Sequence, residues 1–165
     1  MSVVDDAVNW AIGIANDNSH GYDQTHRDGP DYDCSSLICH AYANAGLNTR
    51  PGYTPSTHTM YSVFLAAGFQ DVTDAVNLQT GAGLIRGDVL LNIQNHTAMS
   101  IGNGQVVQAS QNEFGGIAGG QIGDQTGQEI WVTGYYNYPW NKVLRYTGGG
   151  GVTPSGIYIV RWIPG

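Results

Sequence analysis

The sequence has 165 residues, of which 41% are hydrophobic, so it is long enough for one domain with a sizeable core. Its formal net charge is −7, and its six lysines and arginines are scattered along the chain. This balance argues against binding to nucleic acids or anionic membranes, both of which need a concentrated basic surface. Twenty-four glycines and ten tyrosines with few charges favour many turns and short strands, as in a sheet-rich domain with some helix.

The first residues contain neither a basic segment nor a long apolar stretch, so we predict no signal peptide and no membrane span. We therefore expect a soluble chain made in the cytoplasm. The two cysteines, Cys34 and Cys39, lie on one predicted helix and point to different sides of it. No disulfide is predicted between them.

The first predicted helix begins after Ser2, which opens a capping box with Asp5, and ends near Asn16. Its apolar residues recur at the spacing of one buried helix face. A polar, acidic loop over residues 17–33 follows and leads to the next helix.

Residues 32–38, Tyr-Asp-Cys-Ser-Ser-Leu-Ile, place a cysteine where the second helix should begin. Apolar residues recur at helical spacing as far as Ala45, and Gly46 stands where a left-handed C-terminal cap is expected. Asp33 precedes the helix as a natural N-cap, since its carboxylate can accept a hydrogen bond from a free amide of the first turn. This pattern predicts a helix from about Cys34 to Ala45.

Cys34 is expected to face the interior of the protein. At 100° per residue it falls within roughly 10° of the centre of the apolar stripe, whereas Cys39 falls about 130° away. The helix N-terminus stabilises a thiolate, so we expect it to lower the pKa of Cys34 and favour a nucleophile. The alternative is that Cys34 is simply a small buried hydrophobic residue.

A third helix is predicted from about Ser56 to Ala67, with Gly68 ending it. After Gly68 the hydrophobic period changes to two, which indicates strands. Helices followed by a run of short strands are typical of an α+β fold. The predicted strands are Phe69–Thr73, Gly87–Ile93, His96–Ile101, Gln105–Ser110, Glu129–Thr133 and Lys142–Tyr146.

Two glycine-rich segments divide the second half of the chain. The loop over residues 111–128 is too long for a simple turn and is of the kind that often frames a site. The four glycines at 148–151 are predicted to form a flexible linker. We therefore predict one folded domain over residues 1–146, and a linker with a short C-terminal segment over residues 147–165.

A cysteine nucleophile needs an imidazole base, and His96 is the best candidate among five histidines. His40 lies on the cysteine helix but points away from Cys34. His20, His26 and His58 are expected to be solvated residues of loops or of a first helical turn. His96 instead opens a strand at the edge of the predicted sheet.

Gln108 is the candidate partner of His96, but only in one hairpin register. If the loop after the His96 strand holds three residues, Gly102 to Gly104, then Ser100 faces Val106 and Gln108 shares the face of His96. A two-residue turn would move Gln108 to the opposite face, because a one-residue slip inverts every side chain. The sequence alone leaves both registers open.

Two separated motifs carry a resemblance to a known family. Asp33–Leu37 followed by His96–Ser110 resembles the NlpC-type cell-wall cysteine peptidases. More narrowly, Tyr22, the Arg-Asp-Gly-Pro of residues 27–30 and the Tyr-Asp-Cys-Ser-Ser of residues 32–36 resemble the bacteriophage peptidoglycan hydrolase family found at the front of endolysins.

The resemblance spans about Val3 to Tyr146 and implies a papain-like NlpC-type α+β fold. In such a fold, N-terminal helices pack on an antiparallel sheet, here of about six strands, that carries the histidine. It also implies the residue roles. Cys34 matches the nucleophile, His96 matches the base, and Gln108 occupies the position of a third, orienting residue that is often histidine in the family.

Three further residues match family positions around the nucleophile. Tyr22 matches a tyrosine whose hydroxyl joins the Cys34 amide as an oxyanion donor, and Asp33 and Ser35 match positions that help to hold the stem peptide. The implied mechanism is attack by the Cys34 thiolate, paired with protonated His96, on an amide carbonyl. A thioester follows, which water activated by His96 hydrolyses.

The implied function is that of an endolysin catalytic domain that cuts an amide bond in peptidoglycan without a metal or cofactor. We favour a γ-D-glutamyl endopeptidase, because Tyr22, Asp33 and Ser35 match peptide-recognition positions. The alternative on the same fold is an N-acetylmuramoyl-L-alanine amidase. A second alternative is a non-catalytic cell-wall binding module.

A calcium site is a further alternative, because four aspartates lie in one loop. A solvated acidic loop is the simpler interpretation and the one that we prefer. The aspartates are Asp23, Asp28, Asp31 and Asp33.

Bacterial peptidoglycan is the expected partner. Gram-positive walls are anionic and repel a chain of charge −7, so we expect a separate wall-binding domain after the glycine linker. The catalytic chain is expected to be a monomer, made in the host cytoplasm without a signal peptide and acting on the wall after release.

Overall fold

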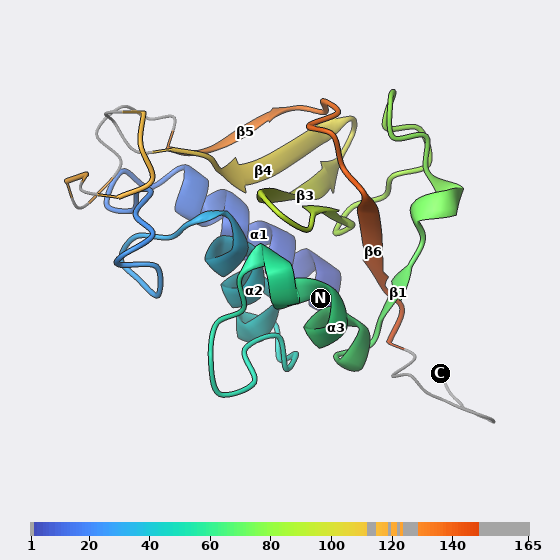
Figure 1. Cartoon of the computed structure of the whole chain (residues 1–165), viewed down its shortest axis with the longest axis horizontal. Helices are drawn as coiled ribbons and strands as arrows, with labels where there is room; N and C mark the ends of the chain where they lie inside the picture. The colour runs from blue at the N-terminus through green and yellow to red at the C-terminus, as the bar shows by residue number, and fades with distance from the viewer. Residues whose placement is uncertain (1, 112–114, 119, 122, 124–128, 149–165) are drawn as a thin grey trace.

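The computed structural model describes residues 2–111, 115–118, 120–121, 123 and 129–148. Within these residues three α-helices, one 3₁₀ turn and a six-stranded antiparallel sheet form an α+β fold, as predicted (Figure 1). The helices are α1 (Val3–Ala15), α2 (Cys34–Asn44) and α3 (Thr57–Ala66), and the 3₁₀ turn is η1 (Thr73–Ala75). The strands are β1 (Phe69–Asp71), β2 (Val89–Asn92), β3 (His96–Gly102), β4 (Gln105–Ala109), β5 (Ile130–Gly134) and β6 (Lys142–Tyr146).

The helix ends follow the capping rules that predicted them. Ser2 caps α1 by accepting a hydrogen bond from the Asp5 amide at 3.1 Å. Gly46 and Gly68, which follow α2 and α3, have φ values of 102° and 106°, so both helices end in a left-handed residue that favours glycine. The helix boundaries agree with the predicted ones to within one or two residues.

The sheet has the order β1-β6-β2-β3-β4-β5, and all neighbouring strands are antiparallel. Helix α1 packs against α2 and against β4 and β5, while α2 packs against β3 and β4 (Figure 1). Helix α3 lies against β1 and β6 at the other end of the sheet. The amino end of α2 is thereby brought to the start of β3.

The β3–β4 hairpin has the two-residue turn of one predicted register and the strand pairing of the other. Gly102 pairs with Gln105, so the turn holds two residues, and Asn103 and Gly104 both have positive φ, as a type I′ turn requires. A bulge between Ser100 and Gly102 then shifts the register by one residue.

Because of this bulge Ser100 pairs with Val106, which is the pairing expected for a three-residue loop. Gln108 therefore stays on the face of His96, as the functional hypothesis requires. The two-residue turn is compatible with the site because the bulge compensates for it.

Hydrophobic residues pack on both faces of the sheet. The larger core lies between the sheet and the helices and includes Leu37, Met99 and Val107, all fully buried. A smaller core on the opposite face contains Ala98 and Trp140. Since side chains alternate along β3, His96 belongs to the face of the smaller core.

Helix α2 is more deeply buried than an amphipathic surface helix. All nine residues from Cys34 to Tyr42 are buried, including Cys39, which was expected to point away from the core. His40 was expected to be solvated, but it is buried and its Nε2 atom lies 2.8 Å from Asp28 Oδ1. The loop before α2 covers the helix side that the sequence pattern left to solvent.

The predicted domain boundary at residue 146 coincides with the end of β6. The predicted linker at 148–151 lies outside the described residues except for Gly148, and residues 152–165 lie entirely outside them. The loop over residues 111–128 is described only in part.

Gly87 allows the close packing of the helices at the start of β2. Its φ is 93°, and a Cβ atom there would lie 2.4 Å from Val4 Cγ1 and 2.8 Å from the Tyr42 hydroxyl. Gly52 also has positive φ, at 82°, but a Cβ atom there would meet nothing within 4 Å. An alanine at position 52 would therefore meet backbone strain alone, whereas an alanine at position 87 would meet both backbone strain and steric overlap.

We expect Gly52→Ala to cost about 1 kcal/mol of unfolding free energy, from the left-handed backbone alone. Gly87→Ala should cost about 3 kcal/mol or more, because overpacking adds to the same strain. Urea unfolding followed by circular dichroism measures both changes. Equal losses in the two variants would contradict the packing described for Gly87.

Candidate active site

The amino end of α2 is fixed by the Asp33 side chain. Asp33 Oδ1 accepts a hydrogen bond from the Ser36 amide at 2.9 Å, and the Ser36 hydroxyl lies 2.9 Å from the Asp33 amide. These two contacts form a reciprocal capping box. Cys34 follows the cap directly, so the cap determines where its side chain enters the site.

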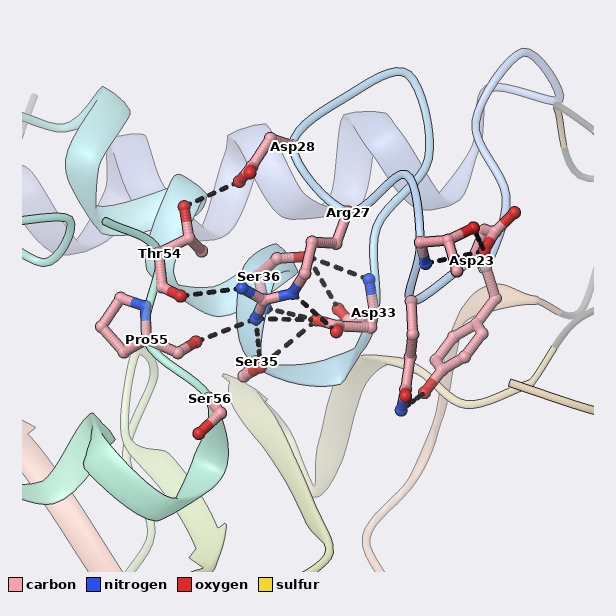
Figure 2. A network of polar contacts seen from close by, with 12 residues as sticks. Asp23, Arg27, Asp28, Asp33, Ser35, Ser36, Thr54, Pro55 and Ser56 are labelled. Atoms are coloured by element: carbon pink, nitrogen blue, oxygen red, sulfur yellow. Dashed lines mark hydrogen bonds and ion pairs between the residues drawn. The ribbon is translucent and has the colours of Figure 1, made fainter. Parts of the chain in front are cut away.

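Arg27 holds the same carboxylate from the preceding loop. Its Nε atom donates to Asp33 Oδ2 at 2.8 Å, and Nη2 donates to Asp33 Oδ1 at 3.2 Å and to the Ser35 hydroxyl at 2.7 Å. Nη1 and Nη2 also donate to the carbonyl oxygens of Thr54 and Pro55 (Figure 2). One guanidinium thus joins the loop before α2, the start of α2 and the loop before α3.

Tyr22 is held beside the cysteine helix by buried carboxylates. The Tyr22 amide donates to Glu129 Oε1 at 2.8 Å, and the preceding Gly21 amide donates to Asp31 Oδ1 at 2.9 Å. Both acidic residues are almost fully buried. Only glycine fits at position 21, because a Cβ atom there would lie 2.7 Å from Glu129 Oε1 and 2.4 Å from the Gly123 carbonyl oxygen.

His96 and Gln108 are in direct contact, which only one of the two hairpin registers left open by the sequence allows. His96 Nε2 lies 2.8 Å from Gln108 Oε1, and both side chains are buried. Since an amide oxygen only accepts, His96 Nε2 carries the proton and the other ring nitrogen, Nδ1, is free to act as a base. The Tyr136 hydroxyl donates to the same Oε1 atom at 2.6 Å.

The segment between β5 and β6 surrounds His96 with aromatic rings. The Tyr138 ring centroid lies 4.9 Å from that of His96, and the Trp140 ring stacks at 5.7 Å. Trp140 is buried, whereas Tyr138 is 40% exposed. These contacts restrict the imidazole to one orientation and shield it from water.

Cys34 is buried close to these residues, with 6% of its surface exposed. The backbone amide of Thr97, the residue after His96, interacts with the sulfur as a hydrogen-bond donor. Burial, reinforced by the negative charge of Asp33, raises the pKa of the Cys34 thiol to about 12, although the Thr97 and Ser35 amides and Arg27 act in the opposite direction. The expected lowering by the helix terminus is therefore outweighed by desolvation.

The histidine is also shifted toward its neutral form. Burial lowers the pKa of His96 below its ordinary value, and the hydrogen bond to Gln108 opposes this only in part. Burial thus favours the neutral forms of the thiol and of the imidazole, whereas the sequence analysis expected a thiolate and an imidazolium.

A polar groove of about 420 Å³ opens over Cys34. Asp33, Cys34 and Ser35 line one side of it together with Arg27, while the start of α3 and the turn before β3 line the other. Asp33 and Ser35 thus reach the groove, where both side chains also accept hydrogen bonds from Arg27. The residues that line the opposite wall are Ser56, Thr57, His58, Gln94 and Asn95.

The four aspartates of the acidic loop do not converge on one point. Asp23 accepts from the Thr25 hydroxyl at 2.6 Å, Asp28 from the Thr54 hydroxyl at 2.7 Å, and Asp33 from Arg27. Asp31 accepts from the Gly21 amide. Over the part of the chain that the structure describes, no three His, Cys, Asp or Glu side chains cluster as metal ligands would.

No described helix is long and apolar enough to cross a bilayer.

The sequence did not predict that Tyr136 and Trp140 contact the site, nor that Arg27 donates five hydrogen bonds there. The segment Tyr-Tyr-Asn-Tyr-Pro-Trp at residues 135–140 is dense in aromatic residues, and this density was the available signal. Arg27 was recognised only as part of a motif. Its partners at Thr54 and Pro55 are distant in sequence, so no local pattern could identify them.

The comparisons with known proteins agree with this architecture. The family model described as "Endolysin-like domain" matches residues 28–107 and 106–149. No curated protein sequence matches the chain.

Among solved structures, NlpC1 from Trichomonas vaginalis is 21% identical with a TM-score of 0.50, over 86% of this chain and 44% of NlpC1. NlpC2 from the same organism is 19% identical with a TM-score of 0.51, over 88% of this chain and 47% of NlpC2. The chain therefore spans less than half the length of either protein. These similarities confirm the predicted NlpC-type fold.

We expect Arg27→Gln to destabilise the protein by about 3 kcal/mol, because it leaves the Asp33 carboxylate buried without its cation. Arg50→Gln is the matched control, since Arg50 is partly exposed and its Nη2 lies 3.9 Å from Asp28. That variant should lose less than about 1 kcal/mol. Urea unfolding compares the two, and a loss for Arg27→Gln no larger than for the control would contradict the proposed clamp.

The shifted pKa values predict how Cys34 reacts with iodoacetamide. Because burial raises the thiol pKa to about 12, the reaction near pH 7.5 should depend on proton transfer to His96. We expect His96→Gln to slow alkylation about tenfold or more at this pH, and the rate to rise continuously up to pH 10. Mass mapping distinguishes Cys34 from the fully buried Cys39. Rapid alkylation of the variant at pH 7.5 would show that the thiol pKa is not raised.

Proposed function

Because the chain belongs to the endolysin-like domain family, we propose that it is a peptidoglycan hydrolase that cuts an amide bond through Cys34. The observation that carries this proposal is the buried His96–Gln108 pair beside a groove whose wall contains Cys34. A nucleophile at a helix start, a base with a fixed tautomer and an open groove are the parts that acyl transfer to cysteine requires.

The reaction begins with a neutral pair. His96 Nδ1 removes the Cys34 proton while the sulfur attacks the amide carbonyl, and the imidazolium formed keeps its Nε2–H bond to Gln108. His96 then gives the proton to the leaving amine, which departs and leaves a thioester on Cys34. A water molecule deprotonated by His96 hydrolyses the thioester, releases the acid and restores the thiol.

The oxyanion of each tetrahedral intermediate is stabilised by the Cys34 backbone amide and the Tyr22 hydroxyl. Burial and the proximity of Cys34 raise the pKa of Tyr22, so its hydroxyl keeps its proton. A hydroxyl that stays protonated can donate to the developing negative charge. Its position in the free protein is supported by a 3.2 Å hydrogen bond from Gln24 Nε2.

The substrate is a stem peptide of peptidoglycan. Every residue lining the groove other than Cys34 is polar, which suits a short peptide rich in amide and carboxylate groups better than an apolar chain. We favour cleavage after γ-D-glutamyl, with Asp33 and Ser35 helping to hold the peptide. An N-acetylmuramoyl-L-alanine amidase remains the alternative on the same site.

A non-catalytic wall-binding module is the second candidate. The fold alone is compatible with binding, but Cys34 and the His96–Gln108 pair favour catalysis, because binding requires neither.

A net charge of −7 supports a further part of the proposal. Anionic walls repel this chain, so a separate wall-binding domain attached after the glycine segment brings the enzyme to its substrate. The enzyme acts as a monomer on the wall after it is released from the host cytoplasm.

We expect Cys34→Ala to abolish clearing of cell-wall suspensions, because no other described thiol faces the groove. Cys39→Ala is the matched control, since Cys39 lies on the same helix, is fully buried and is absent from the groove. That variant should retain activity. Clearing by Cys34→Ala at the wild-type rate, with both variants folded by circular dichroism, would refute the proposed nucleophile.

The same digests identify the bond by mass spectrometry. An endopeptidase produces peptides that end in γ-D-glutamate and new amino termini on the diamino acid. An amidase instead releases intact stem peptides from the glycan. The appearance of glycan-free intact peptides alone would exclude the endopeptidase.

A further inference from the structure

The carbonyl oxygen of Gln108 accepts two hydrogen bonds. One comes from His96 Nε2 at 2.8 Å and the other from the Tyr136 hydroxyl at 2.6 Å. Gln108 is 3% exposed, so water contributes little to fixing its amide group. With both partners acting as donors, the carbonyl end of the amide faces the imidazole.

This choice matters because glutamine is chemically ambiguous. Its oxygen accepts and its amino group donates, so the amide can pair with either tautomer of a neutral imidazole. If the oxygen faces Nε2, the proton lies on Nε2 and Nδ1 is basic. If the amino group faces Nε2, the proton lies on Nδ1, and that nitrogen can no longer receive a proton from Cys34.

Tyr136 supports the arrangement in which the oxygen faces Nε2, because its hydroxyl donates to that oxygen. Burial raises its pKa, so the hydroxyl stays protonated and its proton is available to an acceptor. Its backbone is held in turn, because Trp140 Nε1 donates to the Tyr136 carbonyl at 2.8 Å and Trp140 is packed in the smaller core. The segment that carries Tyr136 is thus held in place while the Tyr136 hydroxyl bonds to Gln108.

We propose that Tyr136 is a positioning residue for the base: it holds the Gln108 carbonyl toward His96 and so selects the tautomer with a free Nδ1 atom. The inference rests on the proposed function in taking His96 as the base, but the tautomer itself can be measured without turnover. A carboxylate in place of Gln108 would need no such partner, since it only accepts. The Tyr136 hydroxyl compensates for the ability of the Gln108 amide to turn either end toward His96.

The test uses ¹⁵N-histidine-labelled full-length protein carrying Cys34→Ala, with the His96 signals assigned by comparison with His96→Gln. Long-range ¹H–¹⁵N spectra near pH 8 distinguish protonated from bare ring nitrogens. We expect one tautomer, Nε2–H, in the parent. Tyr136→Phe should give a mixture with Nδ1–H.

Tyr135→Phe is the matched control. It removes one hydroxyl from the neighbouring residue, whose hydrogen bond goes to the Leu78 carbonyl and not to the site. This control should keep the single tautomer, and backbone spectra of each variant report whether it is folded. A pure Nε2–H tautomer in folded Tyr136→Phe would overturn the proposal.

Turnover provides the second readout, in proteins that retain Cys34. Loss of one orienting hydrogen bond should lower kcat for a soluble stem-peptide substrate about tenfold in Tyr136→Phe, with KM nearly unchanged. Tyr135→Phe should leave both constants near the wild-type values. An unchanged kcat in Tyr136→Phe would also overturn the proposal.

The two proposals fail in different ways. If Cys34→Ala still clears walls while Tyr136→Phe yields mixed tautomers, the nucleophile is wrong and the positioning role stands. If Cys34→Ala is inactive while Tyr136→Phe keeps one tautomer, the proposed function stands and the positioning role is wrong.

Discussion

The ion pair between Arg27 and Asp33 is the contact on which the site depends. Asp33 caps α2 and so fixes the start of the helix, where Cys34 lies. Arg27 links this cap to the loops before α2 and α3 (Figure 2). The pair also offsets charge beside the sulfur, since Asp33 raises the pKa of Cys34 and Arg27 lowers it. One contact thus affects the position of Cys34, the electrostatics of its sulfur and the wall of the groove.

The second half of the site is built on the opposite side of the sheet from the larger core. His96 and Gln108 face the smaller core, and the β5–β6 segment encloses them with aromatic rings. Cys34 meets this half at the start of β3, through the Thr97 amide. Burial on both sides favours the neutral thiol and the neutral imidazole.

Much of the fold was predictable because its signals are local. Capping residues and apolar periodicity identified three helices and six strands. The candidate pair His96 and Gln108, proposed from the sequence, is in contact in the structure. The bulge after Ser100 was not predictable, because a change of register leaves no mark on short-range composition. The raised pKa of Cys34 was also missed, since desolvation depends on residues that are distant in sequence. The role of Tyr136 depends on a contact across 28 positions of the chain.

The central claim is that the Cys34 sulfur attacks the substrate carbonyl with His96 as its base. It is tested most directly by a stem-peptide analogue that carries an electrophilic ketone or vinyl sulfone in place of the scissile amide. Peptide mapping should locate one adduct on Cys34, formed rapidly near neutral pH and much more slowly in His96→Gln. Labelling of Cys39 instead, or equal rates in the two proteins, would contradict the account.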